Sequence, residues 1–281
     1  MARNGCPVAE LISIVVTTYN RDDALAAVLR ALAGQTDPDF EVIVADDGSR
    51  PSAALLVETW KGRVGQRLEH VWHEDRGFRA AEIRNRAVLL ARGAYVIFLD
   101  GDCLARPDFV ARHRALAQRG HFVAGNRVLL SDAMTKKVLA GQLPVERWPL
   151  SRWLGARLTG GVNRLAALLT LPLGPMRLWR KDRWQGVRSC NLAMWRDDLI
   201  RVDGFDADYQ GWGREDSDLV VRLLRSGVAR KDGNFATGVL HLHHKEFDRA
   251  ALPDNDTRLN AVIGADAIRA RRGLSALKAE A

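Results

Sequence analysis

Two carboxylates that directly follow an apolar run could bind a divalent cation. Asp100 and Asp102, separated by Gly101, come after residues 94–99, Ala-Tyr-Val-Ile-Phe-Leu. The run predicts a buried strand, and in open α/β sheets ligands bind at the carboxyl ends of the strands. Carboxylate oxygens are hard ligands of the kind that Mg²⁺ and Mn²⁺ take, and such a cation can bind a diphosphate. The pattern therefore predicts a metal and diphosphate site at this edge of the sheet.

A second pair of carboxylates, Glu215 and Asp216, stands where a predicted helix begins, after Gly211-Trp212-Gly213-Arg214. A carboxylate at this position could act as a general base on a hydroxyl group. Trp212 offers a flat apolar face that suits stacking on a sugar ring. The competing interpretation is that both acids serve to cap the first turn of the helix.

A histidine-rich stretch, His241-Leu242-His243-His244, follows a short predicted strand. Alternation along a strand would put His241 and His243 on one face. One of the two, with His241 preferred, could complete a metal shell that begins with Asp102. The alternative is that both histidines are structural.

The elements that must hold these residues alternate between strands and helices. Buried strands are expected at residues 12–18, 40–45, 68–72 and 94–99, and helices from residue 22 and over 51–60, 78–91 and 107–118. This alternation is typical of a parallel sheet with crossover helices. The strand ends would then line one crevice with the polar residues Thr17, Asp46, Asp47, Asp75, Arg76, Asp100 and Asp102.

The second half of the chain is less regular. Regular pattern is expected again over residues 189–195 and in a helix over 215–226, and the tail from residue 257 onward is expected to be helical. Proline interrupts the helical stretches between residues 131 and 185, so this segment is expected to be an irregular helical insertion. The interruptions are Pro144, Pro149, Pro172 and Pro175.

Positive charge is concentrated in residues 127–188. This segment has twelve lysines and arginines against three acids, a net charge of +9, in a chain whose net charge is +8. It also holds four of the eight tryptophans. Basic residues interleaved with Trp suit an anionic membrane surface or a phosphorylated acceptor. The alternative is a solvated basic face with the tryptophans packed in the core.

Several classes of protein are disfavoured by the sequence. No apolar run is long enough to span a bilayer, and no secretory leader is recognised, so we expect a cytoplasmic protein. Cys6, Cys103 and Cys190 are too few and too widely spaced for a disulfide framework or a structural zinc site. The first strand leads into Thr-Thr-Tyr-Asn and not into a glycine-rich phosphate loop. No nucleic-acid-binding module is recognised, so no nucleic-acid partner is expected.

In these motifs the chain resembles the family 2 glycosyltransferases with the GT-A fold. The matching segments are residues 15–21 (Val-Val-Thr-Thr-Tyr-Asn-Arg), 46–49 (Asp-Asp-Gly-Ser), 75–78 (Asp-Arg-Gly-Phe) with 84–85 (Arg-Asn), and 98–102 (Phe-Leu-Asp-Gly-Asp). Residues 204–206 and 211–216 are similar to the C-terminal motif of β-1,4-galactosyltransferases and chondroitin polymerases. The resemblance covers residues 12–245 but transfers no motif to the insertion or the tail.

The resemblance implies an α/β GT-A fold, a mostly parallel central sheet flanked by helices with an irregular helical insertion. It implies one catalytic domain over residues 1–250, with a nucleotide-binding half at 10–105, an acceptor-binding half at 106–250 and a helical tail at 251–281. Donor binding is implied for Thr17, Tyr19, Asn20, Arg21, Asp46, Asp47, Asp75, Arg76, Arg84 and Asp100. Asp216 would be the catalytic base, Trp212, Gly213 and Glu215 would bind the acceptor, and Asp102 with His241 or His243 would bind the metal.

The implied activity is metal-dependent, inverting transfer of a sugar from a nucleotide-diphosphosugar, with a UDP-sugar expected, and Mn²⁺ or Mg²⁺ as cofactor. The cation would neutralise the leaving diphosphate while Asp216 deprotonates the acceptor hydroxyl. The acceptor would be a bacterial-type surface glycan or lipid-linked acceptor, such as lipopolysaccharide core, and the enzyme would be peripheral at the inner face of the membrane. Two alternatives stay open: a sugar nucleotidyltransferase, and a non-catalytic protein of this fold that binds polyanions or glycans.

Overall fold

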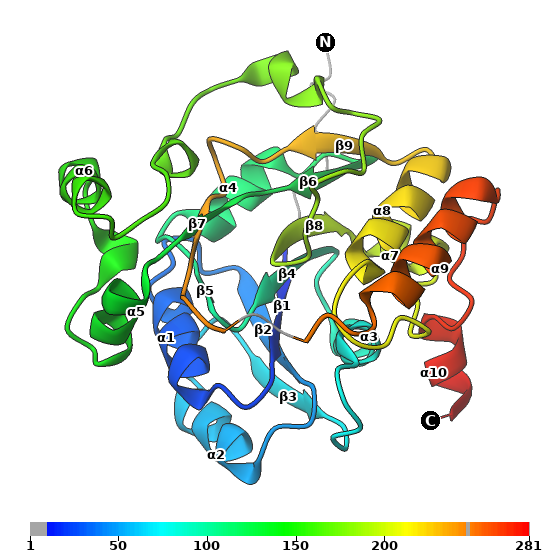
Figure 1. The fold of residues 1–281 in the computed structure, drawn as a ribbon, viewed down its shortest axis with the longest axis horizontal. Helices are drawn as coiled ribbons and strands as arrows, with labels where there is room; N and C mark the ends of the chain where they lie inside the picture. Colours follow the sequence, from blue (N-terminus) through cyan, green and yellow to red (C-terminus); the bar gives the residue numbers. More distant parts are fainter. Residues whose placement is uncertain (1–9, 246–247, 281) are drawn as a thin grey trace.

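The computed structural model describes residues 10–245 and 248–280, and a seven-stranded sheet forms its centre (Figure 1). The strand order is β3-β2-β1-β4-β8-β6-β9. The strands are β1 (Ile12–Thr18), β2 (Phe40–Asp46), β3 (Leu68–Trp72), β4 (Tyr95–Asp100), β6 (His121–Ala124), β8 (Asn191–Trp195) and β9 (Ala229–Asp232). Strands β1 to β4 are parallel, whereas β8 runs antiparallel to both β4 and β6. The mostly parallel α/β architecture predicted from the sequence is confirmed.

Helices cover both faces of the sheet because the strands are apolar on both sides. On β1, Ile14 packs in the core cluster that contains residues of α1 (Asp22–Ala33), α2 (Pro51–Trp60) and α4 (Phe109–Leu116). The next residue, Val15, points to the opposite cluster with α3 (Ala80–Leu90), α7 (Arg196–Arg201) and α8 (Glu215–Arg225). The helices packed on the two faces of the sheet fix the carboxyl ends of β1 and β4 at one edge.

A second, three-stranded sheet of order β5-β10-β7 lies next to the end of β4. It consists of β5 (Cys103–Leu104), β7 (Arg127–Leu129) and β10 (Val239–His241). In the antiparallel pairing of β10 with β5, His241 lies opposite Cys103. This small sheet therefore places His241, the first residue of the histidine-rich stretch, beside the residues that follow Asp100.

The segment between β7 and β8 is irregular and helical, as its prolines predict. It contains α5 (Asp132–Leu139), η1 (Val145–Arg147), α6 (Leu150–Leu158), η2 (Ala166–Leu168) and η3 (Gly174–Leu178), where η marks a 3₁₀ helix. In Figure 1 this green segment forms the left and upper rim of the molecule. Its α5 and α6 stand apart from the central sheet.

The C-terminal tail forms α9 (Leu252–Gly264) and α10 (Leu274–Glu280), so helix begins a few residues earlier than predicted. The hydroxyl of Ser275 donates a 2.6 Å hydrogen bond to Asp203, and this bond fixes α10 to the turn that follows α7. Across residues 10–245 and 248–280, none of the helices has the length and apolar character that a membrane span requires. Cys103 and Cys190 are buried, and neither forms a disulfide. Cys6 and the start of the chain, where a leader would lie, are outside the described residues.

Candidate active site

A cavity of about 980 Å³ opens at the carboxyl ends of β1 and β4. The ends of these strands form one wall, and residues 184–190 with the first turn of α8 form another. Sequence-predicted residues that line the cavity are Thr17, Tyr19, Arg21, Asp47, Arg84, Asp100, Asp102, Trp212, Gly213, Glu215, Asp216, His241 and His243. The strand-end pattern thus predicted most of this lining from residues far apart in the sequence.

The carboxylate of Asp102 lies close enough to two histidines for the three residues to bind one metal ion. Its Oδ1 is 3.5 Å from Nε2 of His241, and its Oδ2 is 3.3 Å from Nε2 of His244. The ligand atoms of these three residues all lie within 4.8 Å of one another. Burial lowers the pKa of His241 to about 3, so its imidazole is neutral and has a nitrogen lone pair to offer. A carboxylate and two imidazoles converging in this way fit a divalent cation.

His243 is not part of this group, although the sequence predicted it on the same face as His241. Strand β10 ends at His241, so the alternation expected for an extended strand does not continue beyond it. The Nδ1 of His243 instead faces Asp132 at 3.7 Å, and its side chain is half exposed. His244, which sequence reasoning passed over, takes the place beside Asp102.

Arg84 connects the two sides of the cavity through its buried guanidinium. It donates hydrogen bonds to Thr17 Oγ1 at 3.0 Å and to Asp100 Oδ1 at 3.3 Å. A third bond, from Nη1 to Glu215 Oε1, measures 3.0 Å. The pKa of the Asp100 carboxyl is raised by burial, and the charge of Arg84 opposes that rise.

Asp216 lies at the cavity wall in the first turn of α8. It accepts a 3.3 Å bond from the backbone N–H of Ser189 and another of 3.3 Å from the Ser217 hydroxyl. Burial raises the pKa of Asp216. Burial, reinforced by the negative charge of Asp216, also raises the pKa of Glu215 to about 7. Raised carboxyl pKa values in a cleft are typical of general acid–base sites.

Asp46, the last residue of β2, and Asp47, the residue after it, have different environments. Asp46 is fully buried, accepts the Ser49 N–H at 2.8 Å and lies 2.9 Å from His70. It does not line the cavity. Asp47 does line it, and its carboxylate accepts the Arg79 N–H at 2.9 Å and faces His73 at 2.6 Å. The structure therefore gives Asp46 a role in holding the strand end and leaves Asp47 next to the cavity.

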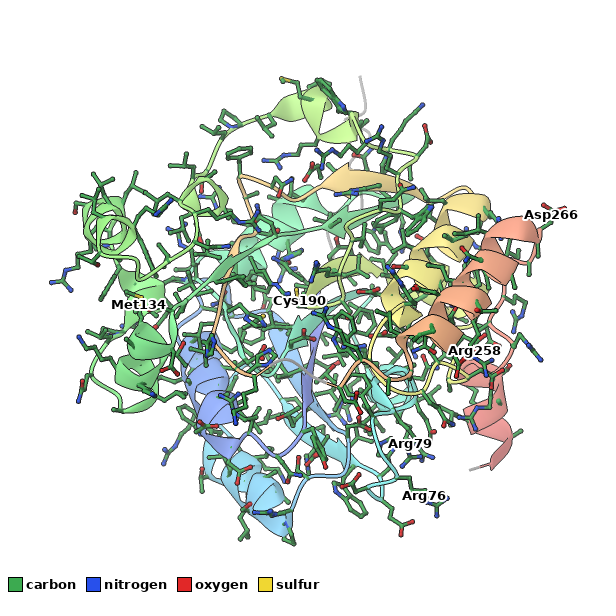
Figure 2. The ribbon with its side chains drawn as sticks, in the orientation of Figure 1. Arg76, Arg79, Met134, Cys190, Arg258 and Asp266 are labelled. Atoms are coloured by element: carbon green, nitrogen blue, oxygen red, sulfur yellow. The ribbon has the colours of Figure 1, made fainter. Side chains whose placement is uncertain are left out.

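Three further residues that the resemblance linked to the donor lie outside the cavity lining. Asn20 has a φ of 48° and accepts a bond from the Arg50 N–H, as expected for a tight-turn residue. Asp75 accepts a 2.9 Å bond from the Tyr19 hydroxyl and so reaches the cavity indirectly. Arg76 is exposed, pairs with Glu74 and projects outward (Figure 2).

Sequence reasoning missed several cavity residues that come from the basic segment. Arg127, Trp184 and Arg188 line the cavity, although no motif marks them. Opposite them, the guanidinium of Arg249 lies 5.1 Å from the centre of the Trp212 ring. The only signal for the arginines in the sequence was the general excess of positive charge.

Two family models and several known glycosyltransferases and polysaccharide synthases match the sequence of this chain. The model of "Glycosyl transferase family 2" matches residues 13–181, and that of "N-terminal domain of galactosyltransferase" matches residues 177–245. Validoxylamine A glucosyltransferase of Streptomyces hygroscopicus subsp. limoneus is 32% identical over 250 residues, 85% of this chain and 53% of that protein. Chondroitin synthase of Escherichia coli is 28% identical over 269 residues, 85% of this chain and 36% of that protein. The chain thus spans about half the length, or less, of these relatives.

Solved structures share the fold at low sequence identity. Residues 1–349 of S. aureus TarS align with a TM-score of 0.59 at 16% identity, covering 92% of this chain and 66% of that one. The mannosyltransferase PcManGT from Pyrobaculum calidifontis aligns with a TM-score of 0.54 at 17% identity, covering 96% of this chain and 78% of that one. These likenesses establish the fold of the chain.

Proposed function

The chain belongs to glycosyl transferase family 2, and on this basis we propose that it moves a sugar from a UDP-sugar to an acceptor hydroxyl with inversion at the anomeric carbon. The observation that carries the proposal is that one cavity is lined by both the Asp102–His241–His244 group and Asp216. The choice of UDP is supported by the TarS structures, which were determined with UDP and with UDP-GlcNAc.

The donor nucleotide would bind in the half formed by residues 10–105. Thr17, Tyr19 and Asp47 line the cavity there and offer hydroxyl and carboxylate groups to a base and a ribose. Asp46 and Asn20 would act indirectly, by fixing the ends of β2 and β1. Residues 106–250 would form the acceptor half, and the helical tail at 251–281 would support it.

The residues around Asp102 suit Mn²⁺ better than Mg²⁺. Mg²⁺ takes oxygen ligands, whereas two of the three groups here are imidazoles. PcManGT was crystallised with GDP-Man and Mn²⁺. When bound, the cation would neutralise the negative charge that develops on the leaving diphosphate. The chain would therefore need no general acid of its own for the leaving group.

Asp216 would be the general base. Burial raises its pKa, which strengthens it as a proton acceptor at neutral pH, and the Ser189 N–H orients its carboxylate. Glu215 is held by Arg84 and would accept a hydrogen bond from the acceptor sugar. The indole of Trp212 would pack on that sugar. Within the described part of the chain, the cavity carboxylates Glu215 and Asp100 are bound by Arg84, and we assign neither as a nucleophile. A single base without a nucleophilic carboxylate supports direct displacement, which turns an α-linked donor into a β-linked product.

The acceptor would be a bacterial-type surface glycan or a lipid-linked glycan, reached from the inner face of the membrane. Two of the arginines that line the cavity, Arg127 and Arg188, belong to the basic segment and suit an acceptor that carries phosphate or carboxylate groups. Chondroitin synthase and hyaluronan synthase are among the relatives.

Release of UDP from a panel of UDP-sugars, with and without Mn²⁺ and with oligosaccharide acceptors, tests the proposal. We expect Mn²⁺-dependent UDP release that increases with one acceptor and gives a β-linked product by NMR. Formation of UTP and sugar 1-phosphate, seen only when pyrophosphate is added to the UDP-sugar, would indicate a nucleotidyltransferase. Absence of both donor binding and turnover across the panel would indicate a non-catalytic binding protein.

A further inference from the structure

Helix α6 has two apolar faces, and the core covers one of them. Trp153 and Ala156 are buried against the rest of the insertion. Leu150, Leu154 and Leu158, spaced four residues apart, form a stripe on the opposite side. Their exposed fractions are 50%, 53% and 81%. Contiguous apolar side chains on a protein surface mark interaction sites, so this stripe of three exposed leucines indicates a docking surface.

Positive charge accompanies the exposed apolar side chains of the insertion. Arg157 is exposed and lies beside the stripe, three residues after Leu154. Arg152 is also exposed but lies on the side of α6 away from the stripe, where its guanidinium is 6.0 Å from the centre of the Trp148 ring. After η3, Trp179 is 83% exposed and is followed by Arg180 and Lys181. Exposed leucines beside an arginine, and an exposed Trp beside two cations, are typical of segments that lie in the interface of an anionic bilayer.

The base of this insertion is part of the cavity wall. Leu129 and Leu130 line the cavity, and the chain leaves them to form α5 and α6. It returns at Val162, which pairs with Leu130, and at Asn163, whose side chain accepts the Leu129 N–H at 3.0 Å. A surface that holds α6 would therefore hold the rim of the cavity close to it.

We propose that the Leu150–Leu154–Leu158 stripe of α6 docks on an anionic lipid bilayer, with Arg157 at the headgroups. The inference rests on the proposed membrane-linked acceptor and names the surface that brings the enzyme to it. An anionic bilayer is favoured over a protein partner because the exposed apolar side chains are accompanied by cations, Arg157 at the stripe and Arg180 with Lys181 after Trp179, in a segment whose net charge is +9.

Flotation with vesicles tests this surface directly. The full chain is mixed with vesicles of phosphatidylcholine alone or of phosphatidylcholine with phosphatidylglycerol, at low and at physiological salt. The test variant is Leu154→Glu/Leu158→Glu, and the matched control is Leu55→Glu, because Leu55 is 70% exposed on the distant helix α2. A third variant, Arg157→Gln, tests the electrostatic part, with roughly a fivefold loss of binding expected for the one charge removed. Its matched control is Arg152→Gln, because Arg152 lies on the side of α6 away from the stripe.

We expect binding to anionic vesicles that falls at least about tenfold in the double leucine variant and is unchanged in Leu55→Glu. Equal binding by the wild type and the double leucine variant, or no vesicle binding by the wild type, would overturn the proposal. So would a wild-type dimer that becomes monomeric in the double leucine variant, since the stripe would then be covered by a second copy. UDP release with a soluble acceptor is expected to be the same in all these variants, so failure of docking is distinguishable from failure of the proposed function.

Discussion

The guanidinium of Arg84 donates a 3.0 Å hydrogen bond to Glu215, a residue that follows it by 131 positions. Arg84 belongs to α3 and Glu215 opens α8, so this pair fixes the first turn of α8 against the ends of β1 and β4. Asp216, the next residue, is thereby held at the same cavity as Asp102.

Replacement of Arg84 by Met should destabilise the protein and abolish transfer. The change leaves the buried Glu215 without its counter-charge, and removing one partner of a buried pair costs about 3–5 kcal/mol. Urea denaturation measures the loss. Arg76→Ala is the control, because Arg76 forms an exposed pair with Glu74 and its removal should change neither stability nor donor binding. A fully stable Arg84→Met protein would contradict the bridging role.

Asp216→Asn should lower kcat by about 10²–10⁴-fold and leave donor binding intact. The amide keeps the size of the side chain but cannot take a proton from the acceptor hydroxyl. Steady-state kinetics and calorimetric titration of UDP would separate the two effects. Near-full transfer by Asp216→Asn would show that the base is another group.

The two histidine positions provide a matched test of the metal site. His244→Ala should weaken Mn²⁺ binding at least about tenfold, because His244 lies 3.3 Å from Asp102. His243→Ala should leave Mn²⁺ binding unchanged, because His243 faces Asp132. Titration of Mn²⁺ monitored by electron paramagnetic resonance measures both. Weaker Mn²⁺ binding in His243→Ala, with unchanged binding in His244→Ala, would show that His243 is the metal ligand, as the sequence predicted.

The rate of transfer should fall as the pH drops through about 7. Burial raises the pKa of Glu215 to about 7, so this carboxyl group gains its proton near neutrality and not near its ordinary value of 4.5. A protonated Glu215 or Asp216 can no longer serve as an anionic acceptor of hydrogen bonds or protons. In Glu215→Gln the acidic limb of kcat/KM should move to lower pH, since the like charge beside Asp216 is removed. A wild-type limb below pH 5 would contradict the raised pKa values.

The sequence predicted the first half of the fold well because its strands are long, buried and followed by polar turns. Strands β1 to β4 lie within a residue or two of their predicted bounds. Strands β5, β6, β7 and β9 were not predicted. They have two to four residues, which is too few to show a periodic apolar signal. Their position is set by pairing with distant strands.

Some site residues are also positioned by pairing between distant strands, and these could not be predicted from the sequence. Asp102 and Asp216 could be predicted because each follows or begins a regular element with a recognisable motif. The place of His244 depends on where β10 ends, which is a property of its pairing with β5 and β7. Asp46 and Asp47 are identical in type and adjacent in sequence, and their different environments arise from His70 and His73 on and after the neighbouring strand.

Diffraction from crystals grown with UDP and Mn²⁺, recorded at a wavelength where manganese scatters anomalously, tests the central claim most directly. We expect one strong anomalous peak between Asp102, His241 and His244, in contact with the diphosphate, with Asp216 facing the same cavity. A diphosphate bound without the cation, or a manganese peak away from these three residues, would contradict it.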